Sequence, residues 1–152
     1  MKTIVAFGEI MGRISMPGFR RIGQCLPGSV EVEFAGAEAN VLTSITLLGG
    51  QTSFVTALPS NEIGDACIAS LRARAVGTAH IRRTPHGRVG LYFVEKGANQ
   101  RSGTVVYDRE GSAVSLTPGS AYDWPAILRD AGWLHLTGIT PAISASGAES
   151  TL

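Results

Sequence analysis

Two phenol side chains and one guanidinium are placed where they could bind a small polyhydroxylated acid. Tyr107 and Arg109 are two residues apart in a strand-like segment, so their side chains point to the same face. Arg109 offers a rigid fork of donors that suits a carboxylate, and Tyr107 offers a hydroxyl and a flat ring. Tyr92, in the preceding strand-like segment, adds a second phenol. These residue types suit a polyhydroxylated acid, although a surface cross-strand pair is the simpler interpretation of the spacing alone.

A glycine-containing turn, AGAEAN at 35–40, leads into a helix-like segment. The backbone N–H groups at such a helix start can face a ligand. Gly36 permits close backbone approach because it has no Cβ, and the amide of Asn40 could point at a sugar hydroxyl. Simple turn chemistry also explains this motif, and it is the interpretation that the motif alone favours.

The other reactive residue types give weaker indications. Asp65 follows Gly64 near a predicted helix start, where it could act as a general base or, more simply, as a helix cap. The three histidines lack a paired carboxylate or nucleophile, and the two cysteines lack a context that would lower a thiol pKa. The sequence contains no C-x-x-C spacing, no G-x-G-x-x-G motif and no P-loop motif.

The elements that must position these side chains begin with a βαβα pattern. Apolar β-branched runs predict strands, and apolar residues at helical spacing predict helices, in the order strand 3–8, helix 38–48, strand 52–58 and helix 63–76. This order predicts a parallel sheet with helices on its faces. Glu9 directly follows the first strand, at the edge where open α/β sheets bind ligands.

A second set of strands is predicted outside this pattern, at 29–34, 89–95 and 104–108, while 11–27 reads as irregular. A polar loop joins the last two of these strands as a hairpin, so the set is expected to be antiparallel and to form a lid or an edge sheet. A short helix over 123–131 and a strand over 133–136 then resume the parallel core.

Near the end of the chain, Ser146 and Glu149 have the spacing of a capping box, which opens a helix. The sequence ends three residues after Glu149. We interpret this as a chain that has been cut, with a frayed tail as the alternative.

Composition excludes several classes of protein. The 152 residues carry 13 basic and 12 acidic side chains without long charge runs, which argues against binding nucleic acid or a membrane surface. No apolar stretch is long enough for a membrane helix, and the first residues do not form a signal peptide. With only two cysteines, we expect a cytoplasmic protein whose fold does not rest on disulfides.

Taken in order, these segments resemble the ribokinase/PfkB carbohydrate-kinase family. The matching segments are Gly8-Glu9, AGAEAN at 35–40, LGG at 48–50 and NEIGD at 61–65. GLYFVE, VVYDREGSA and HLTGITPAIS are similar to segments of 2-keto-3-deoxygluconate kinases, which phosphorylate a terminal hydroxyl of that sugar acid with ATP. The resemblance implies a ribokinase-like three-layer α/β/α fold with an antiparallel β lid, divided into core segments 1–12, 36–85 and 113–152 and lid strands at about 13–35 and 88–110.

The resemblance also implies roles for six residues. They are a backbone contact to the sugar from Gly36, the signature Asn40, the pocket tyrosines Tyr92 and Tyr107, Arg109 near the substrate carboxylate, and Ile139 lining the site from the core. It further implies ATP with Mg²⁺ as cofactors, a small sugar acid as partner, and a homo-oligomer formed through the lid.

One departure from the family pattern affects function more than the others. The family is about twice this length, and its second half supplies a G-A-G-D turn with the catalytic Asp, together with the ATP site. We therefore expect this chain to be a substrate-binding N-terminal portion with no catalytic, cofactor or metal residues of its own. Alternatives are a PfkB kinase for another sugar, such as fructose or a 5-keto-deoxy sugar acid, and a non-catalytic dimeric fragment.

Overall fold

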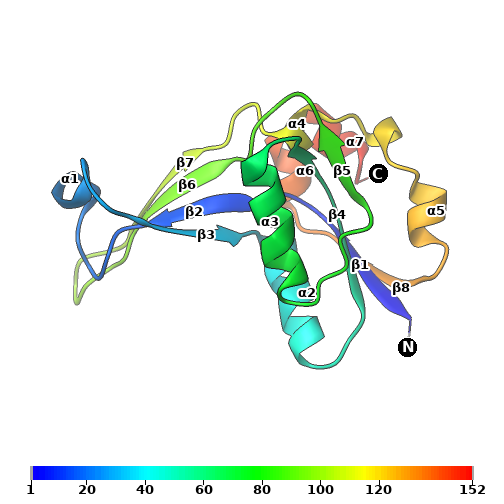
Figure 1. The fold of residues 1–152 in the computed structure, drawn as a ribbon, viewed down its shortest axis with the longest axis horizontal. Helices are drawn as coiled ribbons and strands as arrows, with labels where there is room; N and C mark the ends of the chain where they lie inside the picture. Colours follow the sequence, from blue (N-terminus) through cyan, green and yellow to red (C-terminus); the bar gives the residue numbers. More distant parts are fainter. Residues whose placement is uncertain (1, 152) are drawn as a thin grey trace.

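Two four-stranded sheets form the framework of the protein (Figure 1). The computed structural model describes residues 2–151. The core sheet has the order β5-β4-β1-β8 and contains β1 (Thr3–Phe7), β4 (Thr52–Pro59), β5 (Ile81–Thr84) and β8 (Ala131–His135), all parallel. The projecting sheet has the order β3-β2-β6-β7 and contains β2 (Met11–Ser15), β3 (Glu31–Ala35), β6 (Leu91–Glu95) and β7 (Thr104–Asp108). Figure 1 shows it reaching away from the core.

Helices cover both faces of the core sheet and give it three layers. One face carries α2 (Ala37–Leu47) and α3 (Glu62–Arg72), and the other carries α4 (Ala113–Leu116) and α5 (Trp124–Leu128). The remaining helices are α1 (Ile22–Cys25) at the tip of the projecting sheet, η1 (Gly119–Ala121), α6 (Ile139–Ile143) and α7 (Ala145–Glu149). No helix in the described part of the chain is long and apolar enough to span a membrane.

Alternation along β1 and β4 builds the two halves of the hydrophobic core. Ala6 and Phe54 pack under α2 and α3, whereas their neighbours Val5, Phe7 and Val55 pack under α4 and α5. Successive strand residues point to opposite faces, so an uninterrupted apolar run supplies both faces at once. The expected α/β/α architecture with a parallel core sheet is confirmed.

The same alternation gives the projecting sheet two unlike faces. A polar row crosses all four strands through the register partners Glu33, Arg13, Tyr92 and Tyr107. The next residues along form an apolar row made of Val32, Ile14, Phe93 and Val106. Because neighbouring residues of a strand face opposite ways, the two rows lie on opposite sides of the sheet.

The projecting sheet also corrects two sequence expectations. The segment 11–27, expected to be irregular, contains β2 and α1. β2 lies centrally and pairs parallel with β6, so the sheet is mixed rather than antiparallel. β2 has the sequence MGRIS, in which Gly12 and Arg13 interrupt the apolar alternation that would have indicated a strand. The parallel pairing joins strands nearly eighty residues apart, which no local pattern reveals.

The boundaries of two helices and one strand differ from those expected. α3 ends at Arg72 rather than 76, and Ala75 has a positive φ of 58° that turns the chain so that Val76 reaches the core. α5 is shorter than the expected 123–131, although Asp123 does cap it. β8 begins at Ala131, two residues before the expected start.

The expected capping box at Ser146 and Glu149 is wrong. α7 begins two residues earlier, because the Ser144 hydroxyl accepts a hydrogen bond from the Gly147 N–H at 2.9 Å. Glu149 instead accepts from the Gly119 N–H at 3.3 Å. The sequence ASGAE is therefore the helix itself and not its start signal.

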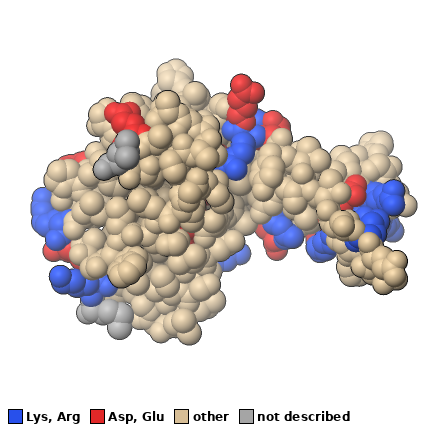
Figure 2. Space-filling model, turned by 180° about the vertical axis from the view of Figure 1, so that it is seen from behind, with Lys and Arg blue, Asp and Glu red and all other residues tan. Residues whose placement is uncertain are grey.

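Basic side chains gather at the far end of the projecting sheet (Figure 2). Arg20, Arg21, Lys96 and Arg101 come from two hairpin ends that are distant in sequence. Two acidic partners, Glu31 and Glu95, lie 3.8 and 3.7 Å from the nearest basic nitrogens. The tip therefore keeps a positive potential at the far end of the sheet.

The two leucines of α2 allow a matched test of the core. Leu42 is 0% exposed and Leu47 is 80% exposed. We expect Leu42→Ala to lower the free energy of unfolding by about 2–5 kcal/mol, because it leaves a cavity under the sheet. Leu47→Ala on the same helix is expected to change it by less than about 0.5 kcal/mol. Urea denaturation followed by circular dichroism measures both, and equal losses would contradict this packing.

Candidate functional site

A cavity of about 170 Å³ lies where the chain passes between the two sheets. Its walls come from the end of β1, the start of α2, strands β6 and β7, and the start of α6. All six residues named from the resemblance line it, namely Gly36, Asn40, Tyr92, Tyr107, Arg109 and Ile139. The structure thus brings together residues that are up to 103 positions apart, from Gly36 to Ile139. Glu9, which the sequence placed at the ligand-binding edge of the sheet without a specific role, lines the same cavity, and so does Glu38, which it did not single out.

The two tyrosines and Arg109 form one layer of this cavity. Tyr92 and Tyr107 are register partners, and their ring centroids are 5.9 Å apart at an interplanar angle of 31°. The guanidinium carbon of Arg109 lies 5.6 Å from the centroid of the Tyr107 ring. Partial burial raises the pKa of Tyr92, because burial disfavours the phenolate relative to the neutral phenol. The layer offers phenol hydroxyls and a cation to the same ligand.

Gly36 allows the start of α2 to pack directly against the end of β1. A Cβ at this position would lie 2.2 Å from the carbonyl oxygen of Glu9 and 3.1 Å from the Cα of Ile10. The sequence indicated close approach to a ligand, and the structure adds close approach to the protein's own backbone. The Gly36 carbonyl accepts a hydrogen bond from the Asn40 N–H at 2.8 Å, which begins the helix and places the Asn40 side chain at the cavity.

A buried carboxylate connects α2 to the chain that follows β8. Glu38 is 2% exposed and accepts hydrogen bonds from the hydroxyls of Thr137 at 2.5 Å and Thr140 at 3.0 Å. The Thr137 hydroxyl in turn accepts from the Ile139 N–H at 3.3 Å. These bonds fix the position of Ile139 opposite the tyrosines. The segments AGAEAN and HLTGIT each contain one side of this contact, but neither segment indicates the other.

Arg109 is already paired with a carboxylate of the protein. Its Nε donates to Glu9 Oε2 at 2.8 Å, and its Nη2 donates to the same oxygen. The Glu9 side chain is 4% exposed and that of Arg109 is 22% exposed. The ion pair is therefore well shielded from water and stronger than a surface pair.

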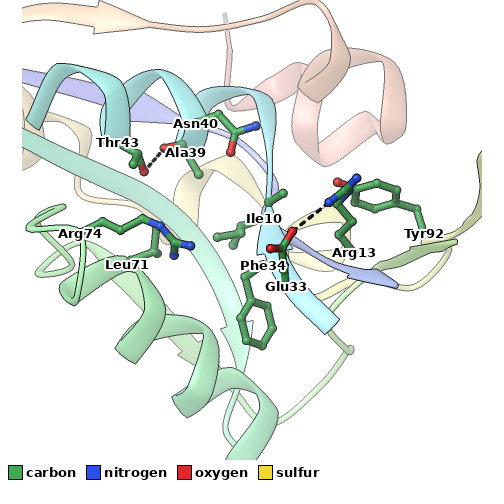
Figure 3. Close-up of a pocket in the computed structure, with 11 residues that line it drawn as sticks. Ile10, Arg13, Glu33, Phe34, Ala39, Asn40, Thr43, Leu71, Arg74 and Tyr92 are labelled. Atoms are coloured by element: carbon green, nitrogen blue, oxygen red, sulfur yellow. Dashed lines mark hydrogen bonds and ion pairs between the residues drawn. The ribbon is translucent and has the colours of Figure 1, made fainter. Parts of the chain in front are cut away.

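A larger cavity of about 350 Å³ adjoins the first and shares Ala35, Asn40 and Tyr92 with it (Figure 3). Figure 3 shows the Arg13–Glu33 pair, 2.8 Å apart, on the projecting sheet and Arg74 on the opposite wall. The polar row of the sheet thus faces both cavities in turn. A ligand in the smaller cavity has an open polar region beside it.

Asp65 plays neither role that the sequence offered. The cap of α3 is Asn61, whose side chain accepts from the Gly64 N–H at 3.0 Å. Asp65 instead pairs with Arg83 Nη1 at 2.8 Å, and it lines neither of the two cavities. Sequence reasoning assigned the cap to Asp65 because both residues lie at the predicted helix start.

Neither the cysteines nor the described acidic and histidine side chains add a reactive centre. Cys25 and Cys67 are buried and unpaired, and burial raises the pKa of the Cys67 thiol to about 12. Residues 2–151 contain no group of three or more His, Cys, Asp or Glu side chains that could bind a metal ion.

A parallel α/β core with a second sheet beside its ligand cavity is the ribokinase-like arrangement. Residues 1–151 match the pfkB family of carbohydrate kinases, and the chain belongs to that family. It is 35% identical over 150 residues to a 2-dehydro-3-deoxygalactonokinase of Haloferax volcanii, a match that covers 97% of this chain and 45% of that relative.

Solved structures show the same likeness. The 2-dehydro-3-deoxygluconokinase of Thermotoga maritima matches with a TM-score of 0.90 and 44% identity, over 95% of this chain and 43% of that one. A fructokinase of Xylella fastidiosa with bound ATP matches with a TM-score of 0.81 and 29% identity, over 98% and 42% of the two chains. The chain therefore spans less than half the length of each of these three relatives.

Two glycines allow a matched test of the contact between α2 and β1. We expect Gly36→Ala to lower the free energy of unfolding by about 1–3 kcal/mol, because the new Cβ displaces the backbone around Glu9. Gly23→Ala in α1, where a Cβ meets no atom within 4 Å, is expected to be neutral or mildly stabilising. Chemical denaturation of both variants measures the difference, and a neutral Gly36→Ala would show that the contact is looser than described.

Proposed function

We propose that this chain forms the sugar-binding part of an ATP-dependent kinase for 2-keto-3-deoxygluconate. The observation that carries the proposal is the single cavity lined by Tyr92, Tyr107 and Arg109 together with Gly36 and Asn40. A cation with two phenols suits a sugar that bears a carboxylate. The names of two relatives, a 2-dehydro-3-deoxygalactonokinase and a 2-dehydro-3-deoxygluconokinase, support a substrate of this chemical class.

Each residue has a distinct role in the proposed complex. Arg109 binds the carboxylate, and the hydroxyls of Tyr92 and Tyr107 bind oxygens at the same end of the sugar. Gly36 brings backbone close to the sugar, and the Asn40 amide binds a hydroxyl. Ile139 contacts the carbon chain from the core side. Together these residues orient the sugar so that its terminal hydroxyl is the acceptor.

In this proposal the projecting sheet is the lid of a single kinase domain. The core consists of residues 1–12, 36–85 and 113–152, and the lid strands occupy about 13–35 and 88–110. Support comes from the polar row, which faces the cavities from the sheet side. A lid over the sugar would exclude water from the transfer reaction.

ATP with Mg²⁺ is the phosphoryl donor that the family implies. Within residues 2–151 no acidic cluster fits a metal ion, and the sequence has no P-loop. We therefore assign no nucleotide contact and no catalytic base to these residues. In the proposal those parts lie outside the 152 residues, and the isolated chain binds sugar without phosphorylating it.

A substrate panel distinguishes this proposal from its nearest alternatives. Fructose is the relevant neutral competitor, because one structural relative is a fructokinase. A 5-keto-deoxy sugar acid is the relevant acidic competitor. A non-catalytic protein that binds none of these sugars is the third alternative, and direct binding measurements identify it.

We also propose that the lid joins two copies of the chain. The apolar row leaves Val32 60% and Val106 48% exposed on the face turned away from the polar row. An apolar row that is exposed on its two outer strands and half-buried at Ile14 and Phe93 on the inner ones is unusual for a monomer and typical of an interface. A second copy would cover it by packing the same face against itself, as twofold symmetry requires.

The first functional test concerns Arg109. We expect Arg109→Ala to weaken binding of 2-keto-3-deoxygluconate by about 10- to 100-fold, because a hydrogen bond to a charged group contributes roughly 1.5–3 kcal/mol. Isothermal titration calorimetry on the 152-residue chain measures the affinity, and a coupled assay with ATP and Mg²⁺ measures phosphate transfer. No transfer is expected from this chain.

Arg101→Ala is the matched control, since it removes the same charge from the loop at the far end of the same sheet. It is expected to leave the affinity unchanged. Unaltered binding by Arg109→Ala would count against an acid substrate. Phosphate transfer by the 152-residue chain would refute the assignment of base and nucleotide site to residues outside it.

The second test concerns the proposed dimer. Val105 and Val106 are 47% and 48% exposed and point to opposite faces of β7. We expect Val106→Glu to shift the chain from dimer to monomer in sedimentation velocity, because it places charge within the apolar row. Val105→Glu is expected to leave the dimer intact. Equal effects of the two variants, or a monomeric parent, would contradict an interface on this face.

A further inference from the structure

All four passages of the chain between the two sheets meet around Glu9. Glu9 itself lies between β1 and β2, and Gly36 lies between β3 and α2. Gly90 precedes β6, and Arg109 follows β7. A Cβ on Gly36 would come within 2.2 Å of the Glu9 carbonyl oxygen, and one on Gly90 within 2.8 Å of Glu9 Oε1. Besides the connection that contains Glu9 itself, two connections therefore have a glycine that makes room for Glu9. The remaining connection carries Arg109, the ion-pair partner of Glu9.

Glu9 engages only one side of the Arg109 guanidinium. Both donors that it uses, Nε and Nη2, converge on the single oxygen Oε2. Among residues 2–151, Arg109 Nη1 forms no hydrogen bond, and the Tyr107 ring lies against the guanidinium group. A guanidinium has a second, end-on pair of donors formed by Nη1 and Nη2, and this pair can take a carboxylate side by side. Each Nη nitrogen carries two hydrogens, and Glu9 takes only the Nη2 hydrogen on the Nε side. The end-on hydrogens of Nη1 and Nη2 are therefore not used by Glu9.

The pair also cancels its own charge. Glu9 is almost completely buried, and its other oxygen, Oε1, has no hydrogen-bond partner within the described residues. A buried carboxylate requires compensation, which Arg109 supplies. Attraction of the site for an acid then depends less on net positive charge than on where the remaining donors point.

We propose that Glu9 is a positioning residue that determines specificity for an acid sugar, by turning the free end of Arg109 toward the ligand carboxylate. This inference rests on the proposed function, because it assumes that Arg109 binds that carboxylate. Glu9 acts through Arg109 and needs no contact with the reacting atoms. The length of the Glu9 side chain, which sets where its oxygens hold Arg109, therefore affects specificity more than its charge does.

Two conservative variants separate reach from charge. Glu9→Gln keeps the length of the side chain and an acceptor oxygen but removes the charge. Glu9→Asp keeps the charge but withdraws the oxygens by one methylene. The readout is the ratio of affinities for 2-keto-3-deoxygluconate and for 3-deoxyfructose, the analogue with a hydroxymethyl group in place of the carboxylate. Calorimetry on the 152-residue chain measures both, and thermal melts check that each variant is folded.

Positioning predicts that Glu9→Gln keeps the preference for the acid within about threefold. It predicts that Glu9→Asp loses about tenfold or more of that preference, the scale of one charged hydrogen bond, with affinity for 3-deoxyfructose unchanged. The reverse order would show that charge and not reach is responsible, and would overturn the inference. So would an unchanged ratio in both variants, or an equal loss for both sugars, which is the mark of a merely structural role.

The parent chain and a control complete the design. Glu31→Ala removes a carboxylate that lies 3.8 Å from Lys96 Nζ on the same sheet and lines neither cavity, and it is expected to leave the ratio unchanged. A parent chain that prefers the acid, together with an intact ratio in Glu9→Asp, refutes only the role of Glu9. A parent chain that binds both sugars alike refutes the proposed function and this inference with it.

Discussion

The position of the cavity between the two sheets depends on a carboxylate buried among hydroxyl groups. Glu38 lies in the first turn of α2, where the helix N-terminus favours negative charge, and its oxygens accept from Thr137 and Thr140. Leaving such a group unpaired in the interior would cost several kcal/mol. The start of α2 and the connection from β8 to α6 must therefore stay together. The end of β1 also packs against Glu38, because Gly8 has no Cβ. A Cβ at Gly8 would overlap the Glu38 side chain.

The projecting sheet has two different faces, a polar face toward the cavities and an apolar face on the opposite side. Its polar row meets the cavities and its apolar row faces away, because strand residues alternate between faces. A shift of register by one residue would exchange the rows and turn Val32 and Val106 toward the ligand. The central parallel pairing of β2 with β6 opposes this shift. Each of these two strands follows a separate connection from the core sheet, so neither strand can slide alone.

Local patterns in the sequence predicted those elements whose chemistry is local. The predicted strand at 104–108 has the same bounds as β7, and the predicted bounds of the first strand and of α2 agree with the structure to within about one residue. Apolar runs, and in two cases a glycine at the end, indicate these elements. β5, with the sequence IRRT, was missed because two arginines disguise an edge strand. Helix α6 was missed because Pro141 lies inside it. Tyr107 and Arg109 were found by their spacing on one strand.

The ion pair and the buried hydrogen bonds that organise the site could not be predicted from local patterns. Nothing near Glu9 indicates Arg109, and nothing near Glu38 indicates Thr140. Resemblance to a family supplied the residues that line the cavity, but it did not supply their partners inside the protein. Those partners are set by three-dimensional proximity alone.

These long-range pairs have a kinetic consequence. Glu9 and Arg109 are 100 positions apart in the chain, and Glu38 and Thr140 are 102 apart. Closing loops of that length costs entropy before any contact forms, so folds rich in such contacts assemble slowly. The cavity can exist only once the first and last thirds of these residues have come together. A ligand bound there stabilises the complete fold by mass action, and cannot select a partly folded intermediate that retains only local helices and hairpins.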